Sequence, residues 1–381
     1  MYAYAFLEDF VLLYPVYALL FAETGLSPAA ISSLFVIWSV TTFTLEVPSG
    51  VWADVFSRRT LLVIAPLLAG TGFGLWSLFP SYPVFALGFV LWGVGSALRS
   101  GTMQALVYEE LDRVGATGAY ARLMGRSEAV SLLAVVAASA VAGPVLAAGG
   151  YRLLGVASVL ACVACAAAGW LLPESRSGGG AEDGEDEPSL GSVVRAGWAQ
   201  VRGAPAVRWA LLLMVVVEGV TSLDEYVPLL AQSTGVAAAS VPLLVLVVTS
   251  GDAVGGWLAG RGVRWLAPLL GAGAVLLAVG ALSGSPGGMV LVGAAFGVFR
   301  WAIAAADARL QARIGDGARA TVTSVAGFGS EVVALLVYAG YALGSRWAGA
   351  GVLVAVAAVP YVVVSVVLGL AGRRGRVHRE M

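Results

Sequence analysis

The sequence is short of charge. Only 12% of its 381 residues are Asp, Glu, Lys or Arg, whereas a soluble globular domain typically has about 25%. Lysine is absent, so all 22 basic residues are arginine. Apolar residues make up 59% of the chain, and its mean hydropathy is +0.89. This composition excludes an ordinary soluble domain and predicts an integral membrane protein.

Histidine and cysteine are also rare. His378, the single histidine, lies close to the C-terminus, and the two cysteines, Cys162 and Cys165, lie in an apolar run. One tail histidine argues against a metal site and against His-based catalysis, so we expect no metal, no cofactor and no enzymatic activity. A C-x-x-C spacing can mark redox or metal chemistry, but these cysteines have no polar neighbours and are expected to be small packing residues.

Long apolar runs account for nearly the whole chain. A helix needs about 20 apolar residues to cross the hydrocarbon core, and these runs are too long and too apolar for the strands of a closed barrel. The first run has no basic region or clear cleavage site, so no cleavable signal peptide is expected. The runs predict an all-α membrane protein with twelve transmembrane helices, at 3–22, 29–52, 60–79, 83–108, 119–147, 152–172, 206–231, 239–260, 264–283, 288–311, 320–344 and 349–371.

One stretch does not fit a membrane. Residues 174–189 are acidic and glycine-rich, a composition that cannot bury a core. We therefore expect a cytoplasmic linker at 174–205. Residues 190–203 fit either an amphipathic interfacial helix or an ordinary linker end. The linker separates an N-terminal bundle, 1–173, from a C-terminal bundle, 206–372, with a tail at 373–381.

The arginines set the predicted orientation. If the N-terminus is inside, only Arg152 and Arg346 fall in outer loops, whereas the inner segments hold nearly all the others. Cytoplasmic loops carry an excess of basic residues. The pattern therefore predicts an even number of spans with both termini in the cytoplasm.

Carboxylates inside the predicted spans are the most informative polar residues. A charged side chain at the bilayer centre costs at least about 2.5–3.5 kcal/mol, so such groups normally face a water-filled cavity or a partner. The chain carries them at Glu8, Asp9, Glu46, Glu128, Glu218, Asp224, Glu225, Asp252, Asp307 and Glu331. This pattern predicts a polar pathway through the protein.

Some of these acids recur between the two halves. Placing Thr24 on Thr234 superimposes Glu8 on Glu218, and the sequence Ala-Pro-Leu-Leu occurs at both 65–68 and 267–270. Similar registers pair the acids Glu46 with Asp252 and Glu128 with Glu331. The coincidences favour a duplication into two pseudo-symmetric bundles of six helices, as in many transporters.

The segment Gly50-Val-Trp-Ala-Asp54-Val-Phe-Ser-Arg58-Arg59 closely resembles the signature loop of the major facilitator superfamily. The resemblance implies that family's fold. It also implies conformational gating at the inner face by Gly50, Asp54, Arg58 and Arg59, with Glu109 or Glu110 as partners. The chain departs from the family pattern at Val55 and Ser57, and a weakened copy at 256–264 has Gly260 in place of the acid.

Two further motifs bear on the resemblance. The arginine that precedes G-x-G in the fourth span of the family would fall on Phe89 here, so Arg99 is either a structural arginine that snorkels or pairs or a functional one. The Gly143-Pro144 step is similar to a motif typical of antiporters. The run 45–50, with Tyr108-Glu109-Glu110, is similar to bacterial drug and metabolite exporters, which implies an inner (plasma) membrane location.

Carboxylates in a medium of low dielectric favour their neutral form, so they can carry protons or pair with a cationic substrate. We predict these roles for Glu8, Asp9, Glu46, Glu128, Glu218, Asp224, Glu225, Asp252 and Glu331. The alternative is that each acid pairs with Arg99, Arg300 or a helix end and holds spans together. For Asp307 a local salt bridge is expected. Aromatic cavity walls are predicted at Tyr14, Trp38, Tyr226 and Tyr338, although most aromatics in membrane spans are packing residues or interface anchors.

Together these features predict a secondary active transporter. We expect a proton-coupled exporter, an antiporter of a small organic, cationic or amphipathic compound, that works by alternating access. Its partners would be the substrate, protons and the lipid bilayer, with no nucleic acid and a monomer favoured. Three alternatives stay open: a proton-coupled importer, a membrane sensor or scaffold that binds without transport, and a polytopic membrane enzyme.

Overall fold

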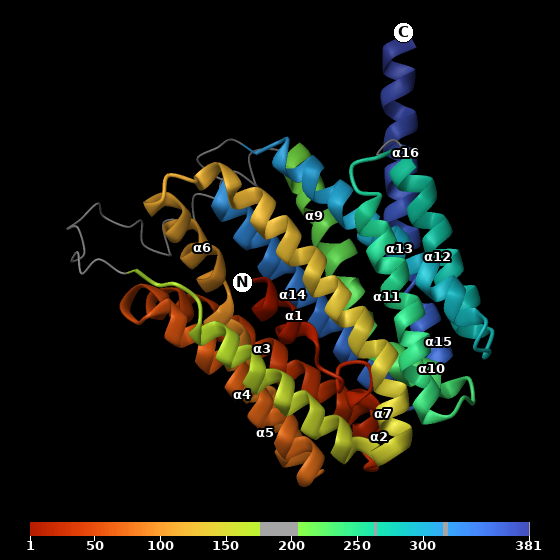
Figure 1. Cartoon of the computed structure of the whole chain (residues 1–381). Helices are drawn as coiled ribbons and strands as arrows, with labels where there is room; N and C mark the ends of the chain where they lie inside the picture. The colour runs from red at the N-terminus through yellow and green to blue at the C-terminus, as the bar shows by residue number, and fades with distance from the viewer. Residues whose placement is uncertain (176–204, 263–264, 315–318, 381) are drawn as a thin grey trace. The chain divides into compact units, whose positions relative to one another are not determined.

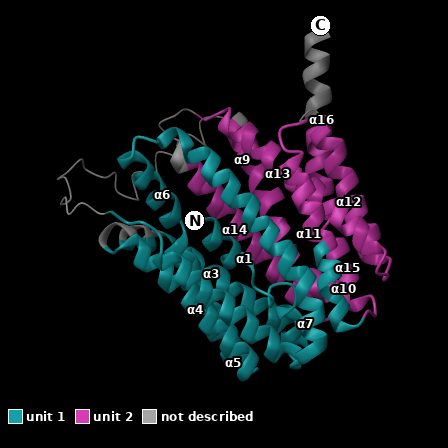
Figure 2. Ribbon diagram, in the orientation of Figure 1, with its two compact units in different colours: residues 1–181, 237–246 teal, residues 182–236, 247–381 magenta. Residues whose placement is uncertain are grey.

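The computed structural model describes residues 1–175, 205–262, 265–314 and 319–380, and these residues are almost entirely helical (Figure 1). The chain divides into two compact units (Figure 2): unit 1 comprises residues 1–181 and 237–246, and unit 2 comprises residues 182–236 and 247–381. The interfacial helix predicted at 190–203, with nearly all of the linker, lies outside the described residues.

Unit 1 is built from the N-terminal helices. In chain order they are α1 (Tyr2–Asp9), α2 (Tyr17–Glu23), α3 (Pro28–Val55), α4 (Arg58–Leu78), α5 (Tyr82–Arg99), α6 (Thr102–Arg113), the 3-10 turn η1 (Thr117–Ala119) and α7 (Tyr120–Trp170). Serine side chains cap two of them. The Ser27 hydroxyl accepts from the Ala30 N–H at 3.2 Å, and the Ser57 hydroxyl accepts from the Thr60 N–H at 3.1 Å. Such caps satisfy amide groups that the first turn leaves unpaired.

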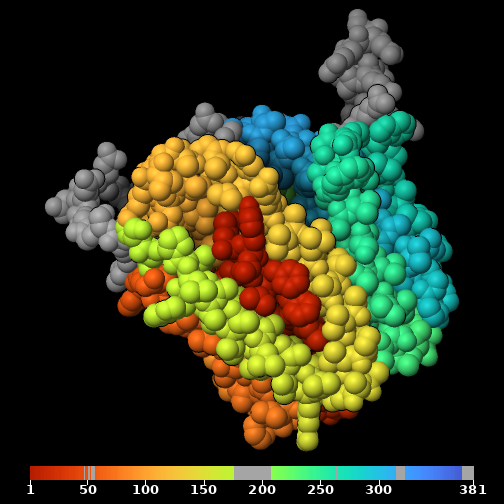
Figure 3. Space-filling model, viewed as in Figure 1, coloured from red at the N-terminus to blue at the C-terminus, as the bar shows by residue number. Residues whose placement is uncertain are grey.

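The element α7 is two helices joined by a sharp turn. Gly149 and Gly150 have non-helical backbone, and Gly150 has φ +62°, which only glycine adopts at no steric cost. The two arms match the predicted spans 119–147 and 152–172. Helix α1 packs along α7, and Figure 3 shows it between the two arms.

Four predicted spans, 3–22, 83–108, 206–231 and 349–371, are not continuous helices among the described residues. The span 83–108 turns at Ser100–Gly101, between α5 and α6, and the span 349–371 is split into α15 (Ala350–Val356) and α16 (Val359–Glu380). Helix α16 also includes most of the predicted tail. Within the described residues, eight helical stretches are long and apolar enough to cross a membrane. The stretches Tyr82–Arg113 and Ala350–Leu370 are each among these eight, so the two predicted spans are present but contain a local turn, which a run's mean hydropathy does not register.

The first predicted span, 3–22, is broken in its middle. Between α1 and α2, residues 10–16 leave the helix, and Pro15 in this stretch has no backbone N–H to donate. The Leu13 N–H donates instead to the Ser158 hydroxyl on α7, at 3.2 Å. Side chains and neighbouring helices can satisfy the backbone of a broken membrane helix in this way.

Replacing Ser158 by Ala tests that contact. The change leaves the buried Leu13 N–H without its acceptor, which is expected to cost about 1–3 kcal/mol and to lower the apparent melting temperature in detergent. Ser77→Ala is the matched control, because the buried Ser77 hydroxyl donates to Phe73 O of its own helix and, within the described part of the chain, to no other helix. Equal melting temperatures for the two variants would contradict the assignment.

Aromatic side chains form the core of unit 1 beside this break. Trp76 is fully buried, and its indole N–H donates to Phe85 O at 3.1 Å. Phe21 and Phe85 lie 4.3 Å apart between ring centroids. Phe89, at the position where the superfamily has an arginine, is buried against Trp76 at 4.7 Å. This position therefore has a packing role here.

Unit 2 contains the C-terminal helices. They are α9 (Pro205–Val220), the 3-10 helix η2 (Thr221–Tyr226), α10 (Val227–Ser233), most of α11 (Val241–Trp257), α12 (Leu266–Leu282), α13 (Gly288–Gln311), α14 (Arg319–Gly344), α15 and α16. The 3-10 turn η3 (Ala238–Ser240) and the first residues of α11 group with unit 1. The predicted span 206–231 is thus interrupted by η2.

The interruptions of the two units fall at equivalent positions. Thr24 and Thr234 are 210 residues apart, and in that register the break at 10–16 falls on 220–226, where η2 lies. Thr24 and Thr234 are each followed by a glycine with positive φ, Gly25 at +92° and Gly235 at +83°. The backbone therefore repeats the register that the paired acids suggested.

Helices α11 and α13 touch through their backbones. A Cβ atom added to Gly251 would collide with the carbonyl of Gly293, and one added to Gly255 would collide with the carbonyl of Gly297. Small residues at such positions let membrane helices approach closely. Unit 2 is closed further by the stacked rings of Phe299 and Tyr361, 3.8 Å apart.

Candidate functional site

The best-defined polar site lies inside unit 1. Glu8, near the end of α1, forms an ion pair with the Nε of Arg99, in the last turn of α5. A cation in a helix's last turn is favoured by the partial negative charge there. The side chains are 22% and 45% exposed respectively, so the pair borders open space and is not sealed in the core.

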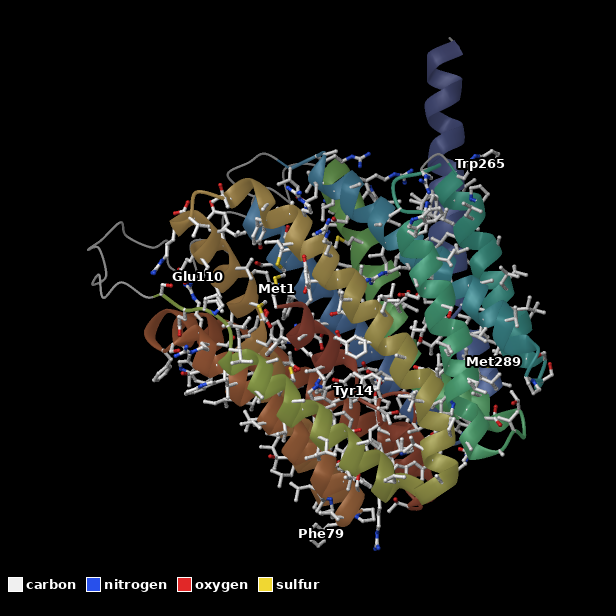
Figure 4. All side chains as sticks on the ribbon, in the orientation of Figure 1. Met1, Tyr14, Phe79, Glu110, Trp265 and Met289 are labelled. Carbon is white, nitrogen blue, oxygen red and sulfur yellow. The ribbon has the colours of Figure 1, made fainter. Side chains whose placement is uncertain are left out.

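That space is a cavity of about 230 Å³. It is bordered by α1, α3, α4, α5 and α7, and Figure 4 shows Tyr14 in the interior of unit 1. Its polar lining comes mainly from Glu8, Asp9, Ser96 and Arg99. A polar cavity bordered by a broken helix is the arrangement in which transporters bind substrates and ions.

Three aromatic rings also line the cavity. Tyr14 stacks on Trp92 at 5.3 Å, and Trp92 lies 5.6 Å from Trp38. Tyr14 is in the break between α1 and α2, so the break turns this ring toward the cavity. Cys162 also lines the cavity and is otherwise buried, with its Cβ 2.8 Å from a Cβ added to Gly70. This contact agrees with a packing role.

Two further predicted acids lie in unit 1. Asp9 interacts electrostatically with Arg99 and with Glu128 of α7, which brings three predicted acids, Glu8 included, into one cluster. Glu46 lies elsewhere on α3, where it is exposed and its Oε1 accepts from the Ser100 hydroxyl at 2.8 Å. It therefore contacts the residue next to Arg99.

Unit 2 repeats part of this arrangement. Asp252 on α11 lies 3.7 Å from the Nε of Arg300 on α13. Arg300 lies three residues after Gly297 on α13, as Arg99 lies four residues after Gly95 on α5. Each unit therefore joins an arginine of its fourth predicted span to an acid. Glu218, the counterpart of Glu8, accepts from the Ser330 hydroxyl at 2.9 Å. Glu331, the residue after Ser330 on α14, is half-buried.

The remaining predicted residues of unit 2 gather at η2. Asp224 and Glu225 belong to this 3-10 helix, and Asp224 occupies the register position of Tyr14. Tyr226 is fully buried and stacks on Tyr341 at 3.6 Å, with Tyr338, also buried, at 6.2 Å. These two predicted cavity aromatics thus take part in the packing of unit 2.

The part of the chain that the structure describes shows no local salt bridge at Asp307, where one was predicted. Among the described residues, its carboxylate accepts from the Gln311 amide at 3.2 Å, one turn along α13, because that side chain lies on the same helical face. No three His, Cys, Asp or Glu side chains of the described residues lie close enough together to hold a metal ion.

The signature-loop residues form a separate network where α3 meets α4 in unit 1. Arg58 forms an ion pair with Glu109 on α6, and its backbone N–H donates to Glu174 at 2.7 Å. Arg59 lies over the ring of Trp170 at 5.2 Å. Gly50 and Asp54 lie in the last turns of α3, and the Asp54 side chain is outside the described part.

Glu110 has a different partner from Glu109. It accepts from the backbone N–H of Ser175 at 2.7 Å and from its hydroxyl at 3.1 Å. Together with the contact of Glu174, this attaches the first residues after α7 to the signature loop and to α6. The start of the linker is thus part of the network.

Sequence reasoning missed Trp92 and left the role of Arg99 open. The signal was present, because Trp92 and Arg99 are seven residues apart on one helix and so share a face. A face that carries both a tryptophan and an arginine inside an apolar span marks a polar pocket more strongly than either residue alone.

The sequence profile described as Major Facilitator Superfamily matches residues 2–338. A solved bacterial homologue of the human lysosomal transporter Spinster, inward-facing and occupied, is similar with TM-score 0.70 and 15% identity, over 98% of this chain and 94% of that one. No curated protein sequence gives a significant match.

Other solved structures agree in fold. The nucleoside transporter NupG is similar with TM-score 0.68 and 14% identity, over 97% of this chain and 96% of that one. A D-xylose–proton symporter has TM-score 0.65 and 15% identity, over 96% and 94% of the two chains. At these identities the likeness concerns the fold alone.

Proposed function

Because the chain belongs to the Major Facilitator Superfamily, whose profile spans residues 2–338, we propose that this membrane transporter is a proton-coupled exporter. It exchanges protons for a small organic compound that is cationic or amphipathic. The observation that carries the proposal is the Glu8–Arg99 pair on the wall of a polar cavity.

The pair offers a mechanism for coupling. An ionised Glu8 attracts Arg99 or a cationic substrate, whereas a protonated Glu8 attracts neither. Asp9 lines the same cavity and adds a second carboxylate. Protons and a cation therefore compete for one set of oxygens, which is the requirement for exchanging one for the other.

The aromatic wall supports an organic cation as the substrate. Tyr14, Trp38 and Trp92 line the same cavity as the acids. A cation over an aromatic face gains about 0.5–2 kcal/mol, and the rings also accept apolar groups.

The second unit would complete the transport cycle. Asp252, Glu218, Glu331 and the acids of η2 are proposed to bind protons or substrate there, as Glu8, Asp9, Glu46 and Glu128 do in unit 1. Two bundles of six helices, with both termini in the cytoplasm of a bacterium, would rock about the substrate during alternating access. The working form is proposed to be the monomer.

A ligand screen followed by flux measurements tests the proposal. Cationic amphipathic compounds such as ethidium and tetraphenylphosphonium are expected to raise the apparent melting temperature of the purified protein, since binding stabilises the folded state. In proteoliposomes, an imposed pH gradient should drive the bound compound against the direction of proton flow. Flow in the same direction would establish an importer, binding without flux a sensor, and chemical turnover without vesicles an enzyme.

The Arg58–Glu109 contact is expected to act in the conformational cycle more than in stability. The Arg58 side chain is 12% exposed, but Glu109 is 47% exposed and stays in contact with solvent when its partner is removed. Arg58→Gln should therefore lower the melting temperature only slightly while slowing transport. Arg58→Glu combined with Glu109→Arg restores the opposite charges and is expected to recover part of the rate. A double variant as slow as Arg58→Glu alone would contradict a role for the pair.

A further inference from the structure

Unit 2 has a second, apolar recess that the proposed transport site does not use. It is a groove of about 680 Å³ along α11, α12 and α13. Its floor is the backbone contact between the glycines of α11 and α13. Its sides carry Val254, Leu258, Leu269 and Val290, and Val254 and Val290 are 56% and 59% exposed.

One end of the groove carries a fixed cation among tryptophans. The Arg261 guanidinium lies over the Trp257 ring at 4.9 Å. The Trp301 indole N–H donates to the Arg261 carbonyl at 2.8 Å, which holds this residue at the groove's mouth. Trp265 lies at the same end, and Figure 4 shows it far from Met289, at the start of α13.

We propose that this groove binds a membrane phospholipid with an anionic headgroup. One acyl chain lies along the glycine floor between α11 and α13, and the phosphate contacts Arg261. The assignment concerns the surface of unit 2 and does not depend on the substrate or direction of transport.

The lining of the groove suits an acyl chain. Polar groups are almost confined to the Arg261 end and Ser250, and the rest of the lining is glycine, valine, leucine and similar side chains. Because bilayer tails are as apolar as these residues, the groove alone provides no selectivity. The selectivity must come from the charged end.

Arg261 is suited to an anionic group. A guanidinium presents a planar set of donors that matches the oxygens of a phosphate. Among the described residues no carboxylate contacts Arg261. Asp252, the acidic residue of α11, is paired with Arg300. A zwitterionic headgroup would bring an ammonium to a site that offers it no acidic partner, so an anionic headgroup is favoured.

The tryptophans locate this end at the membrane boundary. Tryptophan concentrates where headgroups meet hydrocarbon, and Trp257 and Trp265 are 75% and 53% exposed. Basic pockets between membrane helices at this level are suited to anionic headgroups. The cation and the phosphate are therefore expected at the same depth.

The test is lipid retention by the full-length protein. Protein in detergent is incubated with equal amounts of phosphatidylglycerol and phosphatidylcholine, and the lipids that remain bound are identified by native mass spectrometry. The wild type should retain phosphatidylglycerol in preference. Arg261→Gln should lose the preference, and Val254→Trp, which fills the groove, should lose both lipids.

Matched controls separate the groove from general effects. Arg208→Gln removes an exposed arginine on α9, and Val279→Trp adds the same bulk on an exposed face of α12 outside the groove. Both should behave as the wild type, and Val290→Trp provides a second filling variant if Val254→Trp does not fold. The proposal is overturned if Arg261→Gln keeps the preference, if the wild type retains both lipids equally, or if the folded filling variants retain lipid as Val279→Trp does.

Discussion

Glu8→Gln is expected to reduce transport driven by a pH gradient to the level of protein-free liposomes. Glutamine keeps the shape of the side chain and an oxygen that can accept from Arg99, so the ion pair is replaced by a neutral contact. The glutamine amide, however, cannot take up or release a proton at the pH values of a transport experiment. The variant should therefore fold and bind substrate while losing the step that protonation drives.

The measurement compares two kinds of flux in the same proteoliposomes. Exchange of labelled for unlabelled substrate needs no net proton movement, so Glu8→Gln should retain it, whereas uphill flux should disappear. Asp112→Asn is the control, because it removes an exposed carboxylate at the end of α6. Full uphill flux in Glu8→Gln would exclude Glu8 as a coupling group, and loss of both kinds of flux would indicate damage to the site as a whole.

Gly255→Ala is expected to have the largest effect on stability. The added Cβ would collide with the Gly297 carbonyl, and neither backbone can rotate away as a side chain could. Overpacking a well-packed interior typically costs about 1–3 kcal/mol and occasionally more. Here α11 and α13 must separate along their contact, so we expect the upper end of that range and a clear fall in melting temperature.

The adjacent glycine provides the control. A Cβ at Gly256 would meet only the Cγ of Arg300, at 3.8 Å, which is ordinary van der Waals contact. Because Gly in a helix is less favourable than Ala by roughly 0.5–1 kcal/mol, Gly256→Ala should leave stability unchanged or raise it. Similar melting temperatures for the two variants would show that α11 and α13 are not in backbone contact.

The apolar segments were predictable because hydropathy is a local property. The predicted span 288–311 coincides with α13, Gly288–Gln311, and 320–344 with α14, Arg319–Gly344. Any 20-residue apolar run must satisfy its backbone in the bilayer internally, whatever the rest of the chain does. The superfamily followed from one loop, residues 50–59, whose residue types are specific in that position.

The breaks within helices were harder to predict from the sequence. Pro15 and Pro228 lie in or beside the two interrupted segments, but proline also occurs inside continuous helices here, at Pro66 and Pro144. Whether a proline ends a helix depends on which neighbours satisfy the released backbone groups. For the first span the neighbour is Ser158, 145 residues from Leu13.

The sequence alone determined the membrane class, the positions of the apolar segments, the register of the repeat and the list of acids that had to be sheltered from lipid. Tertiary structure alone decided that Glu8 pairs with Arg99, that Asp252 pairs with Arg300, and that Trp92 faces Tyr14. The physical reason is that the cost of placing a charge in lipid belongs to each residue separately. The partner that offsets this cost is chosen by helix packing, which brings together side chains far apart in the chain.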